Sequence, residues 1–166
     1  TDREYLELLL RYNRTLLQRN ALLKQMAENN SFSADTLNIY DEQLAPLGQF
    51  IYQKRKDFME AFLPVFSYQY AYISGGKEQV CLQYESALHQ NSLATLLTEN
   101  VSRDRIAQYT TVGIHKDDLL FEIGGYSMKK YGSQGQQKSF LIALKLSQFE
   151  ILKQQLGVTP IVLLED

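Results

Sequence analysis

Two series of apolar residues, each spaced by alternating steps of four and three, run through the first third of the chain. This spacing places the apolar side chains along one side of an α-helix and is typical of helices that pack along a seam. A short polar segment at 29–33 separates the two series, so we expect an antiparallel helical hairpin. The first series is Tyr5, Leu9, Tyr12, Leu16, Leu23 and Met26, and the second is Leu37, Tyr40, Leu44, Leu47, Ile51, Phe58, Ala61 and Val65.

Polar or helix-breaking residues interrupt both series. Arg19 is the one break in the first series, and Lys54 occupies the single polar position in the second. Pro46 and Gly48 fall inside the second series, and both residue types disfavour a helix interior. We therefore expect a kink or a break in the second helix near these two residues.

Basic residues lie along both expected helices. Such residues can contact nucleic-acid phosphates, whose binding is electrostatic and sensitive to salt. Acidic residues are interleaved with them, which favours a solvated face crossed by salt bridges. The basic residues are Arg11, Arg14, Arg19 and Lys24 in the first helix and Lys54, Arg55 and Lys56 in the second, and the acidic residues include Glu4, Glu7, Asp57 and Glu60.

Short elements of mixed type are expected in the middle of the chain. Alternating apolar residues predict a strand at 79–84, and the Gly75-Gly76 turn would separate it from an earlier strand-like run. A helix is predicted at 91–108. A β-hairpin is predicted at 119–128, turning at Gly124-Gly125.

A His-Lys-Asp-Asp cluster at 115–118 stands just before that hairpin. Such side chains suit metal binding or acid–base chemistry. Only one histidine and no cysteine lie nearby, which argues against a zinc site. We expect a structural or DNA-facing role for His115 and Lys116, and an exposed position for His89 in a polar linker.

A turn of small and polar residues, Ser133-Gln134-Gly135-Gln136, comes immediately before a helix-forming segment. The start of a helix exposes unpaired N–H groups and the positive end of the helix dipole, which suits an anion. Glycine lets a phosphate approach the backbone, while serine and glutamine add hydrogen-bonding side chains. The alternative is an ordinary helix cap, which such residues often form.

The segment after the turn strengthens the phosphate interpretation. A helix is predicted at 140–156, ended by Gly157, and 160–166 reads as a buried strand that ends in Glu165 and Asp166. Carboxylates at the end of such a strand suit a metal-bound nucleotide at the edge of an α/β sheet. This order of turn, helix and strand is that of the signature motif and Walker B strand in ABC-type ATPases.

With these motifs the chain resembles the bacterial RecF DNA replication and repair proteins. The likeness runs through almost the whole chain in one order. Ile114 stands where the family usually has proline, Lys116 where it has arginine, and Glu165 where it has the first of two aspartates. The stretches that carry the likeness are 18–24, 41–44, 73–78, 110–119 and 133–137.

The resemblance implies an α+β (mixed α/β) fold. An antiparallel helical hairpin arm at 1–66 would join the signature-motif part of an ABC/SMC-like ATPase head at 67–166. ATP and Mg²⁺ would be the cofactors, with ATP enclosed between two heads of a homodimer. The implied partners are double-stranded or gapped DNA, a second copy of the protein, and mediator proteins that load RecA, with no membrane.

The resemblance also implies the roles of individual residues. Ser133, Gln134, Gly135 and Gln136 would bind the γ-phosphate of an ATP molecule held by the other head. For the ATP on its own head, Glu165 would be the metal ligand and Asp166 the catalytic residue that polarises the attacking water.

A loop of the form Gly-x-x-x-x-Gly-Lys-Ser/Thr is absent from the sequence, and Ser74-Gly75-Gly76-Lys77 lacks its spacing. We interpret the chain as an internal piece of a longer ATPase, which should not hydrolyse ATP alone. Seventeen Lys and Arg against nineteen Asp and Glu give a formal charge of −2, which argues against a generally basic DNA-binding module. The lone Cys81 and the absence of a signal peptide or membrane-spanning run favour a cytoplasmic protein.

Two other classes of protein share some of these features. An SMC-like structural ATPase head would have the signature and a coiled arm, but with a far longer heptad region. A non-enzymatic helical-hairpin interaction module would use the Ser133 turn only as a helix cap.

Overall fold

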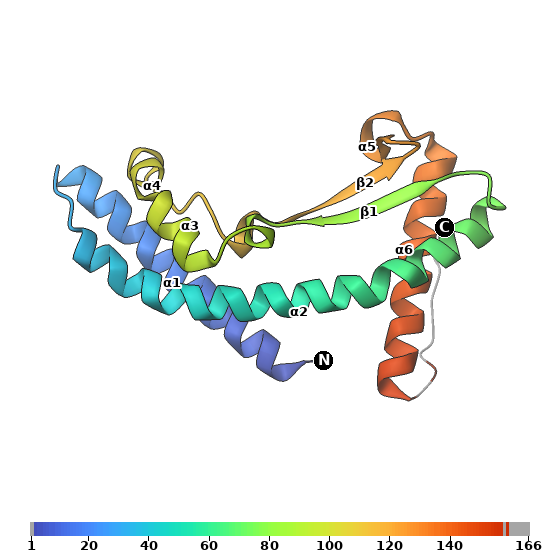
Figure 1. The fold of residues 1–166 in the computed structure, drawn as a ribbon, viewed down its shortest axis with the longest axis horizontal. Coiled ribbons are helices and arrows are strands. Elements are labelled where there is room, and N and C mark those ends of the chain that lie inside the picture. The colour runs from blue at the N-terminus through green and yellow to red at the C-terminus, as the bar shows by residue number, and fades with distance from the viewer. Residues whose placement is uncertain (1, 158, 160–166) are drawn as a thin grey trace. The chain divides into compact units, whose positions relative to one another are not determined.

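The computed structural model describes residues 2–157 and Thr159 (Figure 1). The expected strand at 160–166, with Glu165 and Asp166, lies outside the described residues. The predicted mixed α+β fold is confirmed. The elements are α1 (Arg3–Glu28), α2 (Ala34–Ser74), β1 (Val80–Glu85), the 3₁₀ helix η1 (Ala87–His89), α3 (Leu93–Glu99), α4 (Val101–Ala107), the 3₁₀ helix η2 (Ile114–Lys116), β2 (Asp118–Ile123), β3 (Tyr126–Ser127), α5 (Met128–Tyr131) and α6 (Gln134–Leu156).

The structure divides into two compact units. The first unit contains the chain up to Lys56 together with Glu85–Asp118, and the second contains Asp57–Tyr84 together with the described residues from Leu119 onward. The helix α2 is continuous and contributes to both units. Residue 66, where a division between arm and head was expected, lies inside α2. The hairpin forms one unit together with α3, α4 and the chain up to Asp118.

The predicted helical hairpin is present as α1 and the first part of α2 (Figure 1). The expected break in the second helix is wrong, because α2 continues through Pro46 and Gly48. A Cβ added at Gly48 would lie 2.2 Å from Leu93 Cδ2 and 3.2 Å from Tyr12 Cε2. Glycine at this position therefore lets α2 pack closely against α3 and α1.

Two further elements differ from the sequence prediction. The chain before Gly75-Gly76 is the end of α2 and not a strand, and the Gly76 N–H closes that helix by donating to the Ala71 carbonyl at 2.8 Å. The helix predicted at 91–108 is two helices. Asn100 ends α3, because its N–H and its side-chain amide both donate to the Leu96 carbonyl, at 3.1 and 2.9 Å.

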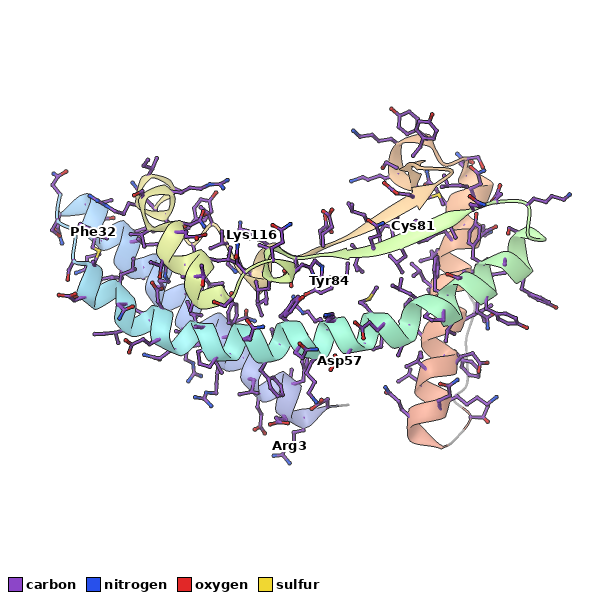
Figure 2. All side chains as sticks on the ribbon, viewed as in Figure 1. Arg3, Phe32, Asp57, Cys81, Tyr84 and Lys116 are labelled. Carbon is purple, nitrogen blue, oxygen red and sulfur yellow. The ribbon has the colours of Figure 1, made fainter. Side chains whose placement is uncertain are left out.

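The second unit contains the predicted strand and hairpin as a three-stranded sheet in the order β1-β2-β3. β2 and β3 are antiparallel, and Gly124 and Gly125 both have positive φ angles, as a tight two-residue hairpin turn requires. An aromatic core fixes α6 in this unit, since Phe140 packs on Phe66 and Phe121 with ring centroids 4.7 and 5.2 Å away. Cys81 lies on β1 as a free, half-buried thiol (Figure 2).

Candidate nucleotide-phosphate site

Ser133 caps α6 through a complete capping box. Its Oγ accepts the Gln136 N–H at 3.2 Å, and Gln136 Oε1 accepts the Ser133 N–H at 2.8 Å. The ordinary helix cap weighed as the alternative is therefore present. A capping box satisfies only two of the four N–H groups at a helix start, so it is compatible with a ligand at the same position.

The two remaining N–H groups belong to Gln134 and Gly135. Neither group donates to an acceptor within the part of the chain that the structure describes. Both residues are exposed, as is Ser133, whose hydroxyl proton remains available to donate. Two open N–H donors, a hydroxyl and the positive end of a 23-residue helix together form a surface suited to an anion.

The two glycines beside Ser133 have different roles. A Cβ at Gly132 would lie 2.5 Å from Met128 Sδ and 2.6 Å from the Met128 carbonyl oxygen, so the fold requires glycine there. A Cβ at Gly135 would meet only Ser133 Oγ, at 4.0 Å. No neighbouring atom therefore excludes a side chain at Gly135.

A carboxylate from outside α6 contacts the capping box. Glu78 Oε1 accepts Gln136 Nε2 at 2.8 Å, and its Oε2 accepts the Tyr70 hydroxyl at 2.6 Å. The hydrogen bonds from Tyr70 and Gln136 hold the pKa of Glu78 below its usual range, so the carboxylate is ionised at neutral pH. Burial and the Glu78 carboxylate raise the pKa of the Tyr70 hydroxyl, which therefore stays protonated as a donor.

Exposed lysines flank this site in the sequence. Lys129 and Lys130 lie in α5, and Lys138 lies in the second turn of α6. Positive side chains around an anion site raise the local concentration of a charged ligand.

Glu165 and Asp166 lie outside the described residues, and their metal and catalytic roles stay predictions. Within residues 2–157, no group of three or more His, Cys, Asp or Glu side chains is arranged to hold a metal ion.

Arg19 lies in the core of the first unit and not on the solvated face that the interleaved charges predicted. Its side chain is 0% exposed. Its Nε donates to Asp41 at 2.5 Å, and its Nη1 donates to Asp104 at 2.7 Å and to Thr110 Oγ1 at 2.8 Å. The signal was available in the sequence, since Arg19 breaks the apolar series at a position that faces the core.

The stretch 110–119, which carries part of the family likeness, forms the other side of this polar network. Asp104 Oδ1 accepts both the N–H and the hydroxyl of Thr111, at 2.8 and 2.6 Å. Asn20 Oδ1 accepts the N–H and the hydroxyl of Thr110, at 2.7 and 2.8 Å. These bonds attach the loop before β2 to α1 and α4, which indicates that the stretch maintains the first unit.

His115 has a structural role in the same loop. Its Nε2 lies 3.0 Å from the Thr110 carbonyl, which can only accept, so Nε2 carries the proton. Its Nδ1 then accepts the Tyr12 hydroxyl at 3.1 Å. Burial lowers the pKa of His115, in agreement with a neutral ring. Lys116 is exposed and lies over the Tyr109 ring, 5.0 Å from its centroid (Figure 2).

Two of the three basic residues of α2, Lys54 and Arg55, are paired with acids elsewhere in the first unit. Lys54 Nζ lies 3.1 Å from Asp2 Oδ2, and Arg55 Nη1 lies 2.8 Å from Asp117 Oδ2. Arg55 also donates to the Ile114 carbonyl at 2.7 Å. Salt bridges therefore account for these two positions, as the interleaved charges suggested.

Arg11 and Arg14 are placed differently. Both are exposed and line a groove of ≈ 320 Å³ between α1 and α2. Thr15, Gln18, Gln43, Pro46 and Leu47 complete the groove, and its lining contains no carboxylate. An electropositive groove with amide donors is suited to phosphate oxygens.

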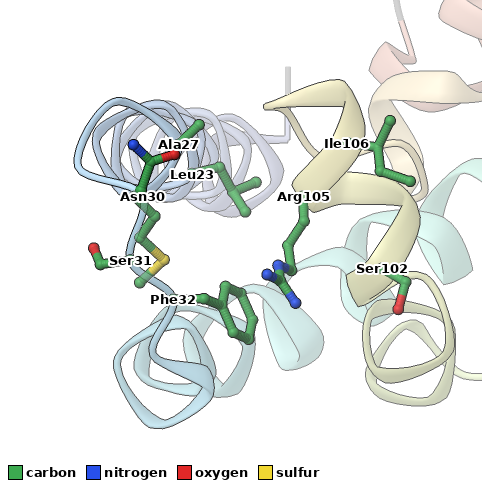
Figure 3. A pocket seen from close by; sticks show the side chains of 9 residues that line it. Leu23, Ala27, Asn30, Ser31, Phe32, Ser102, Arg105 and Ile106 are labelled. Carbon is green, nitrogen blue, oxygen red and sulfur yellow. The ribbon is translucent and has the colours of Figure 1, made fainter.

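A larger pocket of ≈ 530 Å³ lies at the tip of the hairpin (Figure 3). The end of α1, the turn that contains Phe32, and α4 enclose it. The guanidinium of Arg105, the one charged group among its lining residues, lies 4.0 Å from the centroid of the Phe32 ring. This cation–π contact attaches α4 to the hairpin turn.

None of the described helices has both the length and the apolar composition needed to cross a membrane.

Comparisons with known proteins identify the family. No family model matches the chain. The DNA replication and repair protein RecF of Flavobacterium johnsoniae is 55% identical over 165 residues, which cover 99% of this chain and 46% of that protein. The RecF protein of Phocaeicola vulgatus is 45% identical over 166 residues, covering 99% of this chain and 44% of that protein.

Solved structures agree with the sequence relatives. The chain superposes on the recombination mediator protein RecF-ATP in the RecFOR pathway with a TM-score of 0.89 and 35% identity, covering 99% of this chain and 46% of that one. A RecF-ATPrS structure gives a TM-score of 0.86 at 32% identity over 96% of this chain and 45% of that one. The chain therefore belongs to the RecF family of DNA replication and repair proteins, and spans about half the length of the relatives it matches.

Proposed function

We propose that this chain is the arm and signature region of a cytoplasmic DNA recombination and repair ATPase of the RecF type. In this proposal the whole protein binds double-stranded or gapped DNA, dimerises on ATP, and assists mediator proteins in loading RecA. The open start of α6 carries the proposal, because its two unpaired N–H groups are exposed and Gly135 leaves the space in front of them free of a side chain. The relatives described as RecF-ATP and as members of the RecFOR pathway support the choice of nucleotide and of partners.

The residues at the start of α6 would contact the γ-phosphate of ATP held by a second copy of the protein. Ser133 would donate its hydroxyl proton, and Gln134 and Gly135 would donate their backbone N–H groups. Gln136 would act indirectly, since its amide already bonds to the Ser133 N–H and to Glu78. The helix dipole would add attraction for the phosphate charge.

Glu165 and Asp166 would act on the ATP bound to their own head. Glu165 is an oxygen ligand of the kind that Mg²⁺ prefers, and Asp166 would polarise the attacking water. When bound, Mg²⁺ neutralises charge on the phosphate oxygens.

The test is Ser133→Arg in the full-length protein, with the ATP-dependent dimer measured by analytical ultracentrifugation. The arginine side chain would fill the space in front of the two open N–H groups. Loss of one charge-assisted hydrogen bond costs about 1.5–3 kcal/mol, so we expect dimerisation to weaken at least roughly tenfold. Gly135→Ala should also weaken the dimer, because its Cβ would occupy the space in front of the open N–H groups while meeting only Ser133 Oγ within the fold, at 4.0 Å.

The matched control is Gln148→Arg, which places the same charge on an exposed position of the same helix. It should leave dimerisation and ATPase activity unchanged. If Ser133→Arg dimerised on ATP as well as the control does, the assignment of this turn as a signature motif would be wrong.

A further inference from the structure

The segment that ends in Glu78 has no part in the mechanism described above. It begins with the glycine turn Gly75-Gly76, whose φ angles are +67° and +71°. A Cβ at either glycine would meet no atom within 4 Å, so the requirement for glycine is conformational and not steric. The turn reverses the chain after α2 and brings Glu78 to the start of α6, where its carboxylate contacts Gln136.

Glu78 determines which way the Gln136 amide faces. An amide group has one accepting end and one donating end, and a rotation by half a turn exchanges them. An ionised carboxylate can only accept, so it fixes the Nε2 end of Gln136 toward Glu78. The Oε1 end must then face Ser133, where it accepts the N–H at 2.8 Å. The Ser133 N–H favours the same orientation, and Glu78 is the group in the described structure that accepts from Nε2 and holds the amide there.

The orientation of Gln136 decides which N–H groups stay open at the helix start. With Oε1 on the Ser133 N–H and Ser133 Oγ on the Gln136 N–H, only Gln134 and Gly135 remain as free donors. A rotated amide would place its NH₂ group against the Ser133 N–H, two donors facing each other, and the capping box would open. The Ser133 side chain would then lose its fixed position.

Tyr70 holds Glu78 in place from the core. Its side chain is fully buried in the aromatic cluster of the second unit, and its hydroxyl donates to the second carboxylate oxygen at 2.6 Å. A buried aromatic ring has few alternative rotamers, so the hydroxyl is a rigid anchor. The result is one connected chain of hydrogen bonds from Tyr70 through Glu78 and Gln136 to Ser133.

We propose that Glu78 is a positioning residue for the phosphate-binding turn: it orients the Gln136 amide and so fixes Ser133 and the two open N–H groups for the phosphate of a nucleotide on a second copy. This proposal rests on the proposed function of the turn. The role requires an acceptor toward Gln136 and does not require a negative charge.

The experiment compares Glu78→Gln and Glu78→Ala in the full-length protein. Glutamine can accept from Gln136 in one of its two amide orientations, so Glu78→Gln should weaken the ATP-dependent dimer clearly less than Glu78→Ala does. Alanine removes the acceptor. Loss of a helix cap changes an equilibrium constant by roughly two- to thirtyfold, so Glu78→Ala should raise the dissociation constant of the ATP-dependent dimer by roughly tenfold. Tyr70→Phe should have a smaller effect in the same direction.

A second measurement reports on the turn without ATP. Amide hydrogen exchange at Ser133 should accelerate more in Glu78→Ala than in Glu78→Gln, because only alanine removes the acceptor of Gln136 Nε2 altogether. Exchange in the core of α6, around Ala143, should stay unchanged in both variants if the second unit remains folded.

The outcomes separate the two proposals. If Ser133→Arg abolishes the ATP-dependent dimer while Glu78→Ala dimerises normally, the positioning role is overturned and the proposed function stands. If Ser133→Arg has no effect, the proposed function fails, while the exchange rate at Ser133 still decides whether Glu78 orients the turn. Equal weakening by Glu78→Gln and Glu78→Ala would show that the charge matters and would also overturn the positioning role.

Discussion

Arg19 lies between the carboxylates of Asp41 and Asp104, and it donates a further hydrogen bond to Thr110. Asp104 is itself fully buried, so Arg19→Ala would leave a buried negative charge without its cation. Breaking a buried pair in this way costs about 3–5 kcal/mol. In the full-length protein, we expect this loss of stability to accelerate amide hydrogen exchange along α1. Exchange measured in α1 reports on the first unit separately from the rest of the protein.

Arg14 supplies the control for this prediction, because it lies on the same helix and is exposed. Arg14→Ala should change local stability by less than about 0.5 kcal/mol, as is usual for surface positions. Unchanged exchange along α1 in Arg19→Ala would mean that the buried network contributes no stability.

His115 should make the stability of the first unit depend on pH. Its pKa is lowered by burial, so the unfolded chain binds the proton at a higher pH than the folded chain does. The neutral His115 ring therefore contributes its full stability to the fold above the ordinary histidine pKa of about 6.5. This contribution declines as the pH falls below that value toward the lowered pKa of the folded protein. The groups that face the ring are the Tyr12 hydroxyl and the Thr110 carbonyl, with Lys116 and Asp117 beside it in the sequence.

Exchange rates in η2 and α1, measured between about pH 5 and pH 8, provide the test. They should rise at the acid end in the unchanged protein and depend less on pH in His115→Gln, which can replace both hydrogen bonds. His89→Gln is the comparison, since His89 is exposed and contacts Tyr52 in a different place. An identical pH dependence in His115→Gln and the unchanged protein would argue against this origin.

At the scale of elements, periodicity predicted well where one pattern ran for many residues. The hairpin of α1 and α2, the strand β1, the turn at Gly124-Gly125 and the end of α6 at Gly157 all agree with the sequence. Each of these depends on local features that a sequence displays directly, such as apolar spacing or a glycine with positive φ.

The elements that could not be predicted depend on contacts between distant residues. Gly48 suggested a break in α2. Glycine is required at this position because the Leu93 side chain, 45 residues further along the chain, packs where a Cβ would lie. Asn100 divides one expected helix into two because its side chain competes for the Leu96 carbonyl. At the candidate site, the sequence predicted a helix after the Ser133 turn, but α6 begins at Gln134 and not at residue 140, since Ser133 itself is the N-cap. The contact of Glu78 with Gln136 spans 58 residues of sequence and could not be predicted from a local pattern.

At the scale of the whole molecule, the formal charge of −2 means that any DNA contact must be local. Arg55 is a poor choice for testing such a contact, because its ion pair with Asp117 also maintains the fold. Arg11 and Arg14 are exposed, and the groove they line holds no carboxylate. We therefore expect these two arginines to be the part of the arm that contacts DNA phosphates.

The salt dependence of DNA binding by the full-length protein tests this expectation. Each phosphate contact contributes about 0.9 to the slope of log K against log salt, so Arg11→Gln with Arg14→Gln should reduce the slope by roughly 1.8. Arg3→Gln is the matched control, because Arg3 lies on the same helix, is exposed and pairs with Glu7 at 3.1 Å. The control should leave the slope unchanged. The slope counts the phosphates that basic side chains neutralise, because each neutralised phosphate releases its counterions. If the double variant kept the full slope as well, neither arginine would contact a phosphate, and the DNA would contact other surfaces of the protein.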